Sequence, residues 1–209
     1  QYSRRDIGET IRLDGLPVHV AYQAISPQFG LERAKAQARA VRAKLGLPER
    51  FVLCVGSVEP RKRVFEVIDA FAVLADRIPD VQLVIAGRKL FPDYDAGVRI
   101  AERGLSERAR YIGYVADEDL PGLYGAASAL AFASAYEGFG LPIPEAMACG
   151  CPVVSSSNTS LPEAGGEAAV YADPTDAGAF AEALAGVIEP GPERERRIEA
   201  GPVSYTHLT

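Results

Sequence analysis

Cysteine and histidine are scarce in this chain of 209 residues, which holds three cysteines and two histidines. Cys54 lies in an apolar run, and Cys149 and Cys151 are separated by one glycine, so no spacing marks a disulfide framework. The odd number of cysteines favours a reducing compartment. A metal bound by Cys149 and Cys151 would need two further ligands, and neither His19 nor His207 stands at a ligand spacing. The sequence therefore predicts small buried cysteines and no metal site.

Long apolar segments are also missing. No stretch approaches the roughly 18 uninterrupted apolar residues of a membrane span, and the N-terminus lacks the layout of a signal peptide. We expect a soluble, cytoplasmic protein without a transmembrane segment, and peripheral attachment at the inner membrane face stays open. The chain begins with Gln1 rather than methionine, so we expect that an upstream part of the protein has been lost.

Positive charge is in the minority, with 22 Lys and Arg residues against 28 Asp and Glu, a net charge of −6 and a pI near 5.1. This balance opposes attraction of an acidic polymer, so we expect no nucleic-acid partner. Basic residues cluster in Arg61-Lys62-Arg63. Three adjacent cations are too few to follow a nucleic-acid backbone, but they are enough to neutralise one diphosphate.

Short apolar runs alternate with amphipathic stretches. Strands are predicted at 51–56, 81–87, 110–115, 129–134, 152–155 and 168–172. Helices are predicted at 63–76, 95–103, 117–127, 144–148, 175–188 and 193–199. Most strands are too continuously apolar for a half-exposed sheet, so the pattern predicts an α/β, Rossmann-like, doubly wound parallel sheet. Ligands of such a sheet bind at the carboxyl ends of the strands.

The first strand-to-helix junction carries Arg61 and Lys62. It reads Gly56-Ser57-Val58-Glu59-Pro60-Arg61-Lys62, without the three glycines of a dinucleotide site or the Gly-Lys-Ser/Thr of a P-loop. The sequence therefore lacks the motifs that would best indicate NAD binding or ATP hydrolysis. Two cations at a helix start match a diphosphate, and an exposed basic helix start is the equally open alternative.

A second loop, 137–146, follows the strand that ends near residue 134. Gly138 and Gly140 allow the backbone to approach a ligand, and Pro144 suits the first helical position. Glu137 and Glu145 are placed to face one pocket, where each carboxylate would accept from two vicinal sugar hydroxyls. Each residue also has a simpler interpretation when it is considered alone. Glu145 could only complement the helix dipole, and Glu137 could be a solvated loop acid.

The two loops, in this order within the alternating strands and helices, resemble the C-terminal donor-binding domain of glycosyltransferase family 4, also called glycosyl transferases group 1. Members of this family are retaining glycosyltransferases with two facing Rossmann-like domains (GT-B). The resemblance covers roughly residues 17–188, and the Glu-x7-Glu segment is its most specific motif. Ser160-Leu161-Pro162-Glu163 looks like a loop of mannosyltransferase-like members. Many members have a basic residue where this chain has Ser57, so the diphosphate contact would depend more heavily on Arg61 and Lys62.

The resemblance implies a role for each site residue. Lys62 and Arg61 would bind the diphosphate within the segment that starts at Gly56 and Ser57, and Glu137 would lie by the transferred sugar, so these three are the expected catalytic residues. Glu145 would bind the ribose. Phe139, Gly140 and Leu141 would offer backbone N–H groups, and Tyr114 and Val115 would frame the base.

The resemblance further implies transfer of a hexose from a nucleoside-diphosphate sugar to a hydroxyl, with retention of configuration and without a cofactor or metal. The donor would be GDP-mannose or a UDP-sugar, and a missing N-terminal domain would bind the saccharide or other hydroxyl acceptor. This chain would be inactive alone. A nucleotide-sugar epimerase of the same architecture and a non-catalytic nucleotide-binding regulatory half stay open as alternatives.

The expected organisation has five segments. Residues 1–16 would be a remnant of the N-terminal domain or linker without a regular element, 17–30 a hinge, and 31–190 the Rossmann-like domain. Residues 191–200 would form a C-terminal helix, and 201–209 an unstructured, artefactual tail.

Overall fold

Six parallel strands form one sheet in the order β3-β2-β1-β4-β5-β6. The structure is a computed structural model that describes residues 1–11, 16–21 and 23–206, with the backbone alone for 202–206. The strands are β1 Phe51–Val55, β2 Gln82–Ala86, β3 Ala109–Gly113, β4 Ala129–Phe132, β5 Val153–Ser155 and β6 Val170–Tyr171. All neighbouring strands pair in parallel. The predicted α/β, Rossmann-like fold is confirmed.

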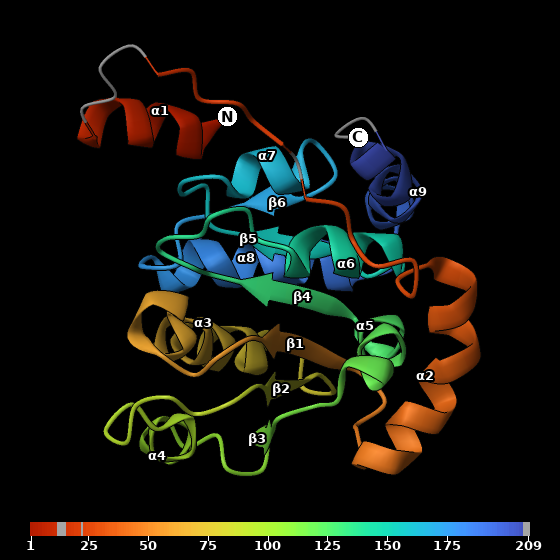
Figure 1. The fold of residues 1–209 in the computed structure, drawn as a ribbon. Helices are drawn as coiled ribbons and strands as arrows, with labels where there is room; N and C mark the ends of the chain where they lie inside the picture. The colour runs from red at the N-terminus through yellow and green to blue at the C-terminus, as the bar shows by residue number, and fades with distance from the viewer. Residues whose placement is uncertain (12–15, 22, 207–209) are drawn as a thin grey trace.

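Helices cover both faces of the sheet (Figure 1). One face carries α3 Val64–Arg77, α4 Ala96–Glu102 and α8 Ala177–Ile188, and the other carries α2 Leu31–Leu45, α5 Leu120–Ala126, α6 Pro142–Ala148 and α7 Leu161–Gly165. Helix α1 is Tyr2–Thr10, α9 is Pro192–Thr206, and two short 3-10 turns are η1 Pro60–Lys62 and η2 Asp117–Asp119. In β1, Val52 and Cys54 belong to one core and Phe51 and Leu53 to the other. Because side chains alternate along a strand, this double burial explains the continuous apolar runs.

Helix α2 has no counterpart among the predicted helices. It buries Ala34 and Val41 only, so its apolar stripe is narrow. Its end carries a clear signal, because Gly46 adopts the left-handed conformation (φ 60°) and the Leu47 N–H donates to the Arg42 carbonyl. A left-handed glycine of this kind is a frequent helix terminator.

The chain ends differ from the expected segments. Residues 2–10 form helix α1 rather than an irregular remnant, and the described part of 17–30 contains no helix or strand. The prediction of an unstructured tail at 201–209 is wrong for its described part, because α9 continues through Thr206. Gly201 is buried, and a Cβ built on it would lie 3.1 Å from the Met147 side chain, so packing against α6 supports this extension. Residues 207–209 lie outside the described part of the chain.

Three further boundaries differ. The segment that begins at Ser160, expected as a loop, starts helix α7. Helix α6 begins at Pro142 rather than Pro144, because either proline is compatible with a first helical turn. The predicted helix 117–127 is divided into η2 and α5.

All three cysteines are free and buried, as predicted. Within the described residues no three metal-binding side chains gather, and no helix is long and apolar enough to cross a membrane.

We predict that Gly125→Ala destabilises the chain by about 1 to 3 kcal/mol, the usual cost of overpacking. Gly125 lies in α5, and a Cβ there would approach the backbone carbonyl atoms of Ala34 in α2 to 2.8 Å. Gly186→Ala in α8 is the matched control, because a Cβ there meets nothing within 4 Å. It should stabilise the helix by about 0.5 to 1 kcal/mol. Urea unfolding of both variants measures the difference, and equal stabilities would contradict the prediction.

Candidate functional site

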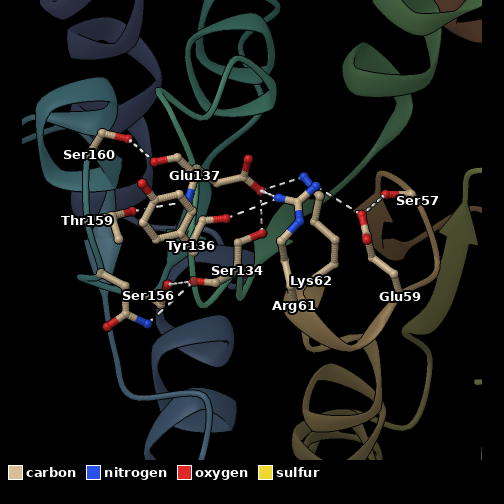
Figure 2. Close-up of polar contacts among 11 residues, drawn as sticks. Ser57, Glu59, Arg61, Lys62, Ser134, Tyr136, Glu137, Ser156, Thr159 and Ser160 are labelled. Carbon is tan, nitrogen blue, oxygen red and sulfur yellow. Dashed lines mark hydrogen bonds and ion pairs between the residues drawn. The ribbon is translucent and has the colours of Figure 1, made fainter. Parts of the chain in front are cut away.

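Two loops meet at the carboxyl edge of the sheet, where β1 and β4 are neighbours (Figure 2). The Ala135 N–H donates to the Arg61 carbonyl across 2.8 Å, which fixes the loop after β4 to the loop after β1. Lys62 Nζ lies 2.5 Å from Glu137 Oε1, and Arg61 Nη1 lies 3.2 Å from the same oxygen. The Ser134 hydroxyl donates to it across 2.8 Å. The structure therefore brings the predicted residues Arg61, Lys62 and Glu137 into one cluster.

Two glycines allow close approach of the backbone beside Lys62. Gly56 has φ 132°, and a Cβ at that position would lie 3.7 Å from the Lys62 side chain. Gly87, at the end of β2, has φ 148°, and a Cβ there would overlap the Gly56 carbonyl oxygen at 1.7 Å. Only glycine permits this close approach. The Lys62 ammonium lies 5.2 Å from the centre of the Phe132 ring, and the side chain is 14% exposed.

Arg61 also contacts several acceptors at once. Its guanidinium lies 2.9 Å from Glu59 Oε1 and donates to the Tyr136 carbonyl across 3.1 Å, and the side chain remains 45% exposed. Glu59 additionally accepts from the Ser57 hydroxyl. Both cations of the cluster are therefore paired with carboxylates, and an incoming anion would compete with Glu137 for them.

The backbone of Glu137 is fixed from a third direction. Its N–H donates to Thr159 Oγ1 across 3.2 Å, and its carbonyl accepts from the Ser160 hydroxyl across 3.0 Å (Figure 2). Both residues lie between β5 and α7. Sequence reasoning missed Thr159 and noted Ser160 only as part of a mannosyltransferase-like loop. Both residues follow a predicted strand, which is where functional loops of a parallel sheet lie.

Glu145 lies in the first turn of α6 and makes a different set of contacts. Its Oε2 accepts from the Tyr124 hydroxyl across 3.1 Å. Burial raises the pKa of Glu145 above its usual range, partly offset by the Tyr124 hydrogen bond, and the charge of Asp117 adds to the increase. The pKa of Tyr124 is raised by burial and then by Glu145. Glu137 and Glu145 thus do not share a partner among the described contacts.

An apolar pocket lies beside Asp117. It has a volume of about 320 Å³, and its lining includes Gly56, Ser57, Val55, Ala86, Gly87, Arg88, Leu90, Tyr114, Val115, Asp117 and Leu120. The predicted residues Gly56, Ser57, Tyr114 and Val115 are therefore brought together. The Arg88 guanidinium stacks over the Tyr114 ring at 4.6 Å. Sequence reasoning missed Arg88 and Asp117, which stand after the ends of β2 and β3.

The remaining predicted residues lie in the loop before α6. Gly140 has φ 93°, and a Cβ there would lie 2.6 Å from the Leu161 side chain, so glycine is required where this loop packs against α7. Leu141 is the residue before the first turn of α6. Phe139 lines a second cavity of about 320 Å³, together with Gly138, Ser160 and residues of α1 and of segment 18–23.

The geometry is a set of adjoining compartments along one edge. An apolar pocket fits a planar ring, two cations fit a diphosphate, and carboxylates fit hydroxyl groups. The pocket and the cationic cluster share Gly56, which lines the pocket and lies against Lys62.

Comparison with known proteins identifies the family of the chain. The sequence model of glycosyl transferases group 1 matches residues 37–203. The O-antigen chain mannosyltransferase B of Escherichia coli is 42% identical over 153 residues, which are 72% of this chain and 40% of that protein. The chain thus spans well under half the length of this relative.

Solved structures show the same fold. Sucrose-phosphate synthase from Thermosynechococcus elongatus superposes with a TM-score of 0.79 and 26% identity over 99% of this chain and 52% of that one. Anabaena Alr3699/HepE, solved in complex with UDP and glucose, superposes with a TM-score of 0.70 and 26% identity over 88% of this chain and 48% of that one.

Proposed function

Because the chain belongs to the glycosyl transferases group 1 family, we propose that it is the donor-binding half of a hexosyltransferase. The reaction transfers a hexose from a nucleoside-diphosphate sugar to a hydroxyl acceptor, with retention at the anomeric carbon. The observation that carries the proposal is the junction of the Lys62, Arg61 and Glu137 cluster with the apolar pocket through Gly56.

Each compartment takes one part of the donor. The base enters the pocket between Tyr114 and Val115, and the ribose hydroxyls reach Glu145. The diphosphate is bound by Lys62 and Arg61 and by backbone N–H groups of Phe139, Gly140 and Leu141. The sugar lies by Glu137. The complex of Alr3699/HepE with UDP and glucose supports the binding of a nucleotide sugar by this fold.

The chemistry follows from charge. Negative charge grows on the diphosphate as the glycosidic bond breaks, and fixed cations stabilise it most in the transition state. Lys62 and Arg61 supply that charge from the protein itself, so we propose that the reaction needs no metal ion. Transfer from a nucleotide sugar also fits better than hydrolysis of a glycoside. A glycosidase needs an acidic proton donor for its leaving group, and a phosphate leaving group makes that donor unnecessary.

We propose GDP-mannose as the donor, with a UDP-sugar as the alternative, since the relative that is 42% identical is a mannosyltransferase. Segments of the complete protein outside this chain would bind the acceptor, and the chain alone would not transfer sugar. We further propose a cytoplasmic location, with peripheral contact to the inner membrane face.

A thermal-shift screen against GDP, UDP, ADP and their sugars tests the proposal, because a ligand that binds the folded state raises its apparent stability. We expect GDP and GDP-mannose to give the largest increase. No increase with any nucleotide would refute a donor-binding half. Nucleotide binding without any transfer by a protein that includes the facing domain would instead indicate a regulatory half, and a changed sugar on the same nucleotide would indicate an epimerase.

We predict opposite effects of Glu145→Gln on stability and on binding. The pKa of Glu145 is raised above 4.5 in the folded chain, so the folded state binds more protons than the unfolded state between pH 4.5 and the raised pKa. Stability from this group therefore falls as pH rises through that window, and the full penalty applies above it. Glu145→Gln should raise the melting temperature at pH 7 to 8 but not below pH 4.5.

The same substitution should weaken binding of GDP or UDP, because an amide accepts from two ribose hydroxyls less well than a carboxylate. Melting curves across pH and calorimetric titration measure the two effects. Glu182→Gln is a control on the exposed surface, where Glu182 pairs with Arg77. Unchanged nucleotide affinity would remove Glu145 from the ribose site.

A further inference from the structure

Thr159 and Ser160 hold both backbone polar groups of Glu137. The N–H of Glu137 is bound by Thr159 Oγ1 at 3.2 Å, and its carbonyl is bound by the Ser160 hydroxyl at 3.0 Å (Figure 2). The next residue, Gly138, is exposed, and a Cβ built there meets nothing within 4 Å. Gly138 therefore adds no packing restraint next to Glu137, and the two hydroxyl contacts fix the Glu137 backbone directly.

Both residues depart from their local preference. Thr159 is left-handed, with φ 53°, a region that β-branched residues rarely adopt because it is strained. Ser160 is the N-cap of α7, where a serine side chain ordinarily accepts from its own helix, yet it makes no such bond and donates to Glu137 instead. Thr159 and Ser160 are adjacent, both have an unusual local structure, and both bind Glu137, which indicates a functional constraint on Glu137.

The carboxylate of Glu137 depends on this backbone position. Its Oε1 receives Lys62, Arg61 and Ser134 at 2.5, 3.2 and 2.8 Å. A shift of the Glu137 backbone would therefore change both the distance to Lys62 and the direction in which the carboxylate meets a sugar. Functional side chains need such support to stay within a fraction of an ångström of their productive position.

We propose that Thr159 and Ser160 are positioning residues that place Glu137 for the sugar of the donor and so determine how much the sugar adds to donor affinity. The proposal rests on the proposed function, because it assumes that the sugar lies by Glu137. It adds that the turn between β5 and α7 acts on the sugar through Glu137 rather than on the nucleotide.

The test measures affinity by calorimetry for GDP and GDP-mannose and for UDP and UDP-glucose, with the chain as it is and with variants. The informative quantity is the Kd of the free diphosphate divided by the Kd of its sugar, in whichever pair binds. Thr159→Val keeps the volume and the branch but loses the acceptor, and Ser160→Ala loses the donor. The double variant should lower the ratio by about fivefold or more, the effect of a typical net hydrogen bond. The Kd of the free diphosphate should not rise, because a displaced Glu137 competes less with a phosphate for Lys62 and Arg61.

Two control variants separate positioning from general damage. Thr159→Ser keeps the hydroxyl and should restore the ratio. Ser128→Ala removes a hydroxyl that accepts from the Phe51 N–H across 3.3 Å at the opposite edge of the sheet, and it should leave the ratio unchanged. Each variant is checked by circular dichroism, and the two single substitutions decide the question if the double variant does not fold.

A double-mutant cycle gives the sharpest outcome. In a Glu137→Gln background, Thr159→Val and Ser160→Ala should have no further effect on the ratio, because they act only through Glu137. An effect that persists there, an unchanged ratio in the folded variants, or equal weakening of diphosphate and sugar would overturn the inference. If the unchanged chain binds no nucleotide, the proposed function fails first. If it binds diphosphates but the sugar adds nothing, only the positioning role fails.

Discussion

Lys62→Ala is expected to weaken binding of GDP or UDP by about tenfold to a hundredfold, the effect of losing one charge-assisted hydrogen bond. The ammonium of Lys62 contacts Glu137 and lies 5.2 Å from the centre of the Phe132 ring, and the side chain is only 14% exposed, so water would replace the ammonium poorly. In a protein with the facing domain, the loss of transition-state stabilisation should be larger, about 2.7 to 4 kcal/mol for one preorganised donor. Calorimetric titration of the chain measures the first effect, and turnover of the larger protein measures the second.

Two lysine variants control this experiment. Lys44→Ala removes an ion pair with Asp119 of 2.7 Å on the α2 surface and should leave nucleotide affinity unchanged. Lys62→Arg keeps the charge but replaces a compact ammonium with a larger, planar guanidinium, so it should recover only part of the nucleotide affinity. Affinity and turnover within a few-fold of the unchanged chain after Lys62→Ala would remove Lys62 from the diphosphate site.

The strands of the sheet could be predicted because each is marked by its own short apolar sequence. Strands β1, β2 and β4 are buried on both faces, so their sequences are continuously apolar and short. Helix α2 was not predicted, because it carries many charges, and helix α9 was predicted only as far as residue 200. Helix α2 buries only Ala34 and Val41, and the end of α9 packs through Gly201 against Met147, a contact that no periodicity reveals.

The candidate site was predictable in its location and less so in its contacts. The rule that ligands bind at the carboxyl ends of parallel strands places Lys62 and Glu137 on one edge, and the structure joins them at 2.5 Å. The hydrogen bond between the Glu137 N–H and Thr159 depends on a left-handed backbone conformation of Thr159, which the conformational preferences of threonine do not predict. The contact of Glu145 with Tyr124 joins α6 to α5, and no spacing along the sequence predicts it.

Glu137→Gln is expected to raise the affinity for a free diphosphate and to reduce the further affinity that the sugar adds. Lys62 and Arg61 both contact the Glu137 carboxylate, so a bound diphosphate must compete with that acid. An amide removes the competing charge, and affinity for GDP or UDP should rise by about tenfold, since charge-assisted hydrogen bonds contribute more than neutral ones. The sugar should then add little, because a glutamine accepts from two vicinal hydroxyls less well than a carboxylate.

Calorimetry on matched pairs of diphosphate and nucleotide sugar separates the two effects, and salt adds a further check. The gain for the free diphosphate should shrink as ionic strength rises, because the 45% exposed Arg61 lets counterions screen part of the pairing. Glu182→Gln, which removes an exposed acid paired with Arg77, should change neither affinity. If Glu137→Gln weakens the free diphosphate and its sugar to the same extent, the acid supports the fold of the loop and does not compete with the phosphate for Lys62.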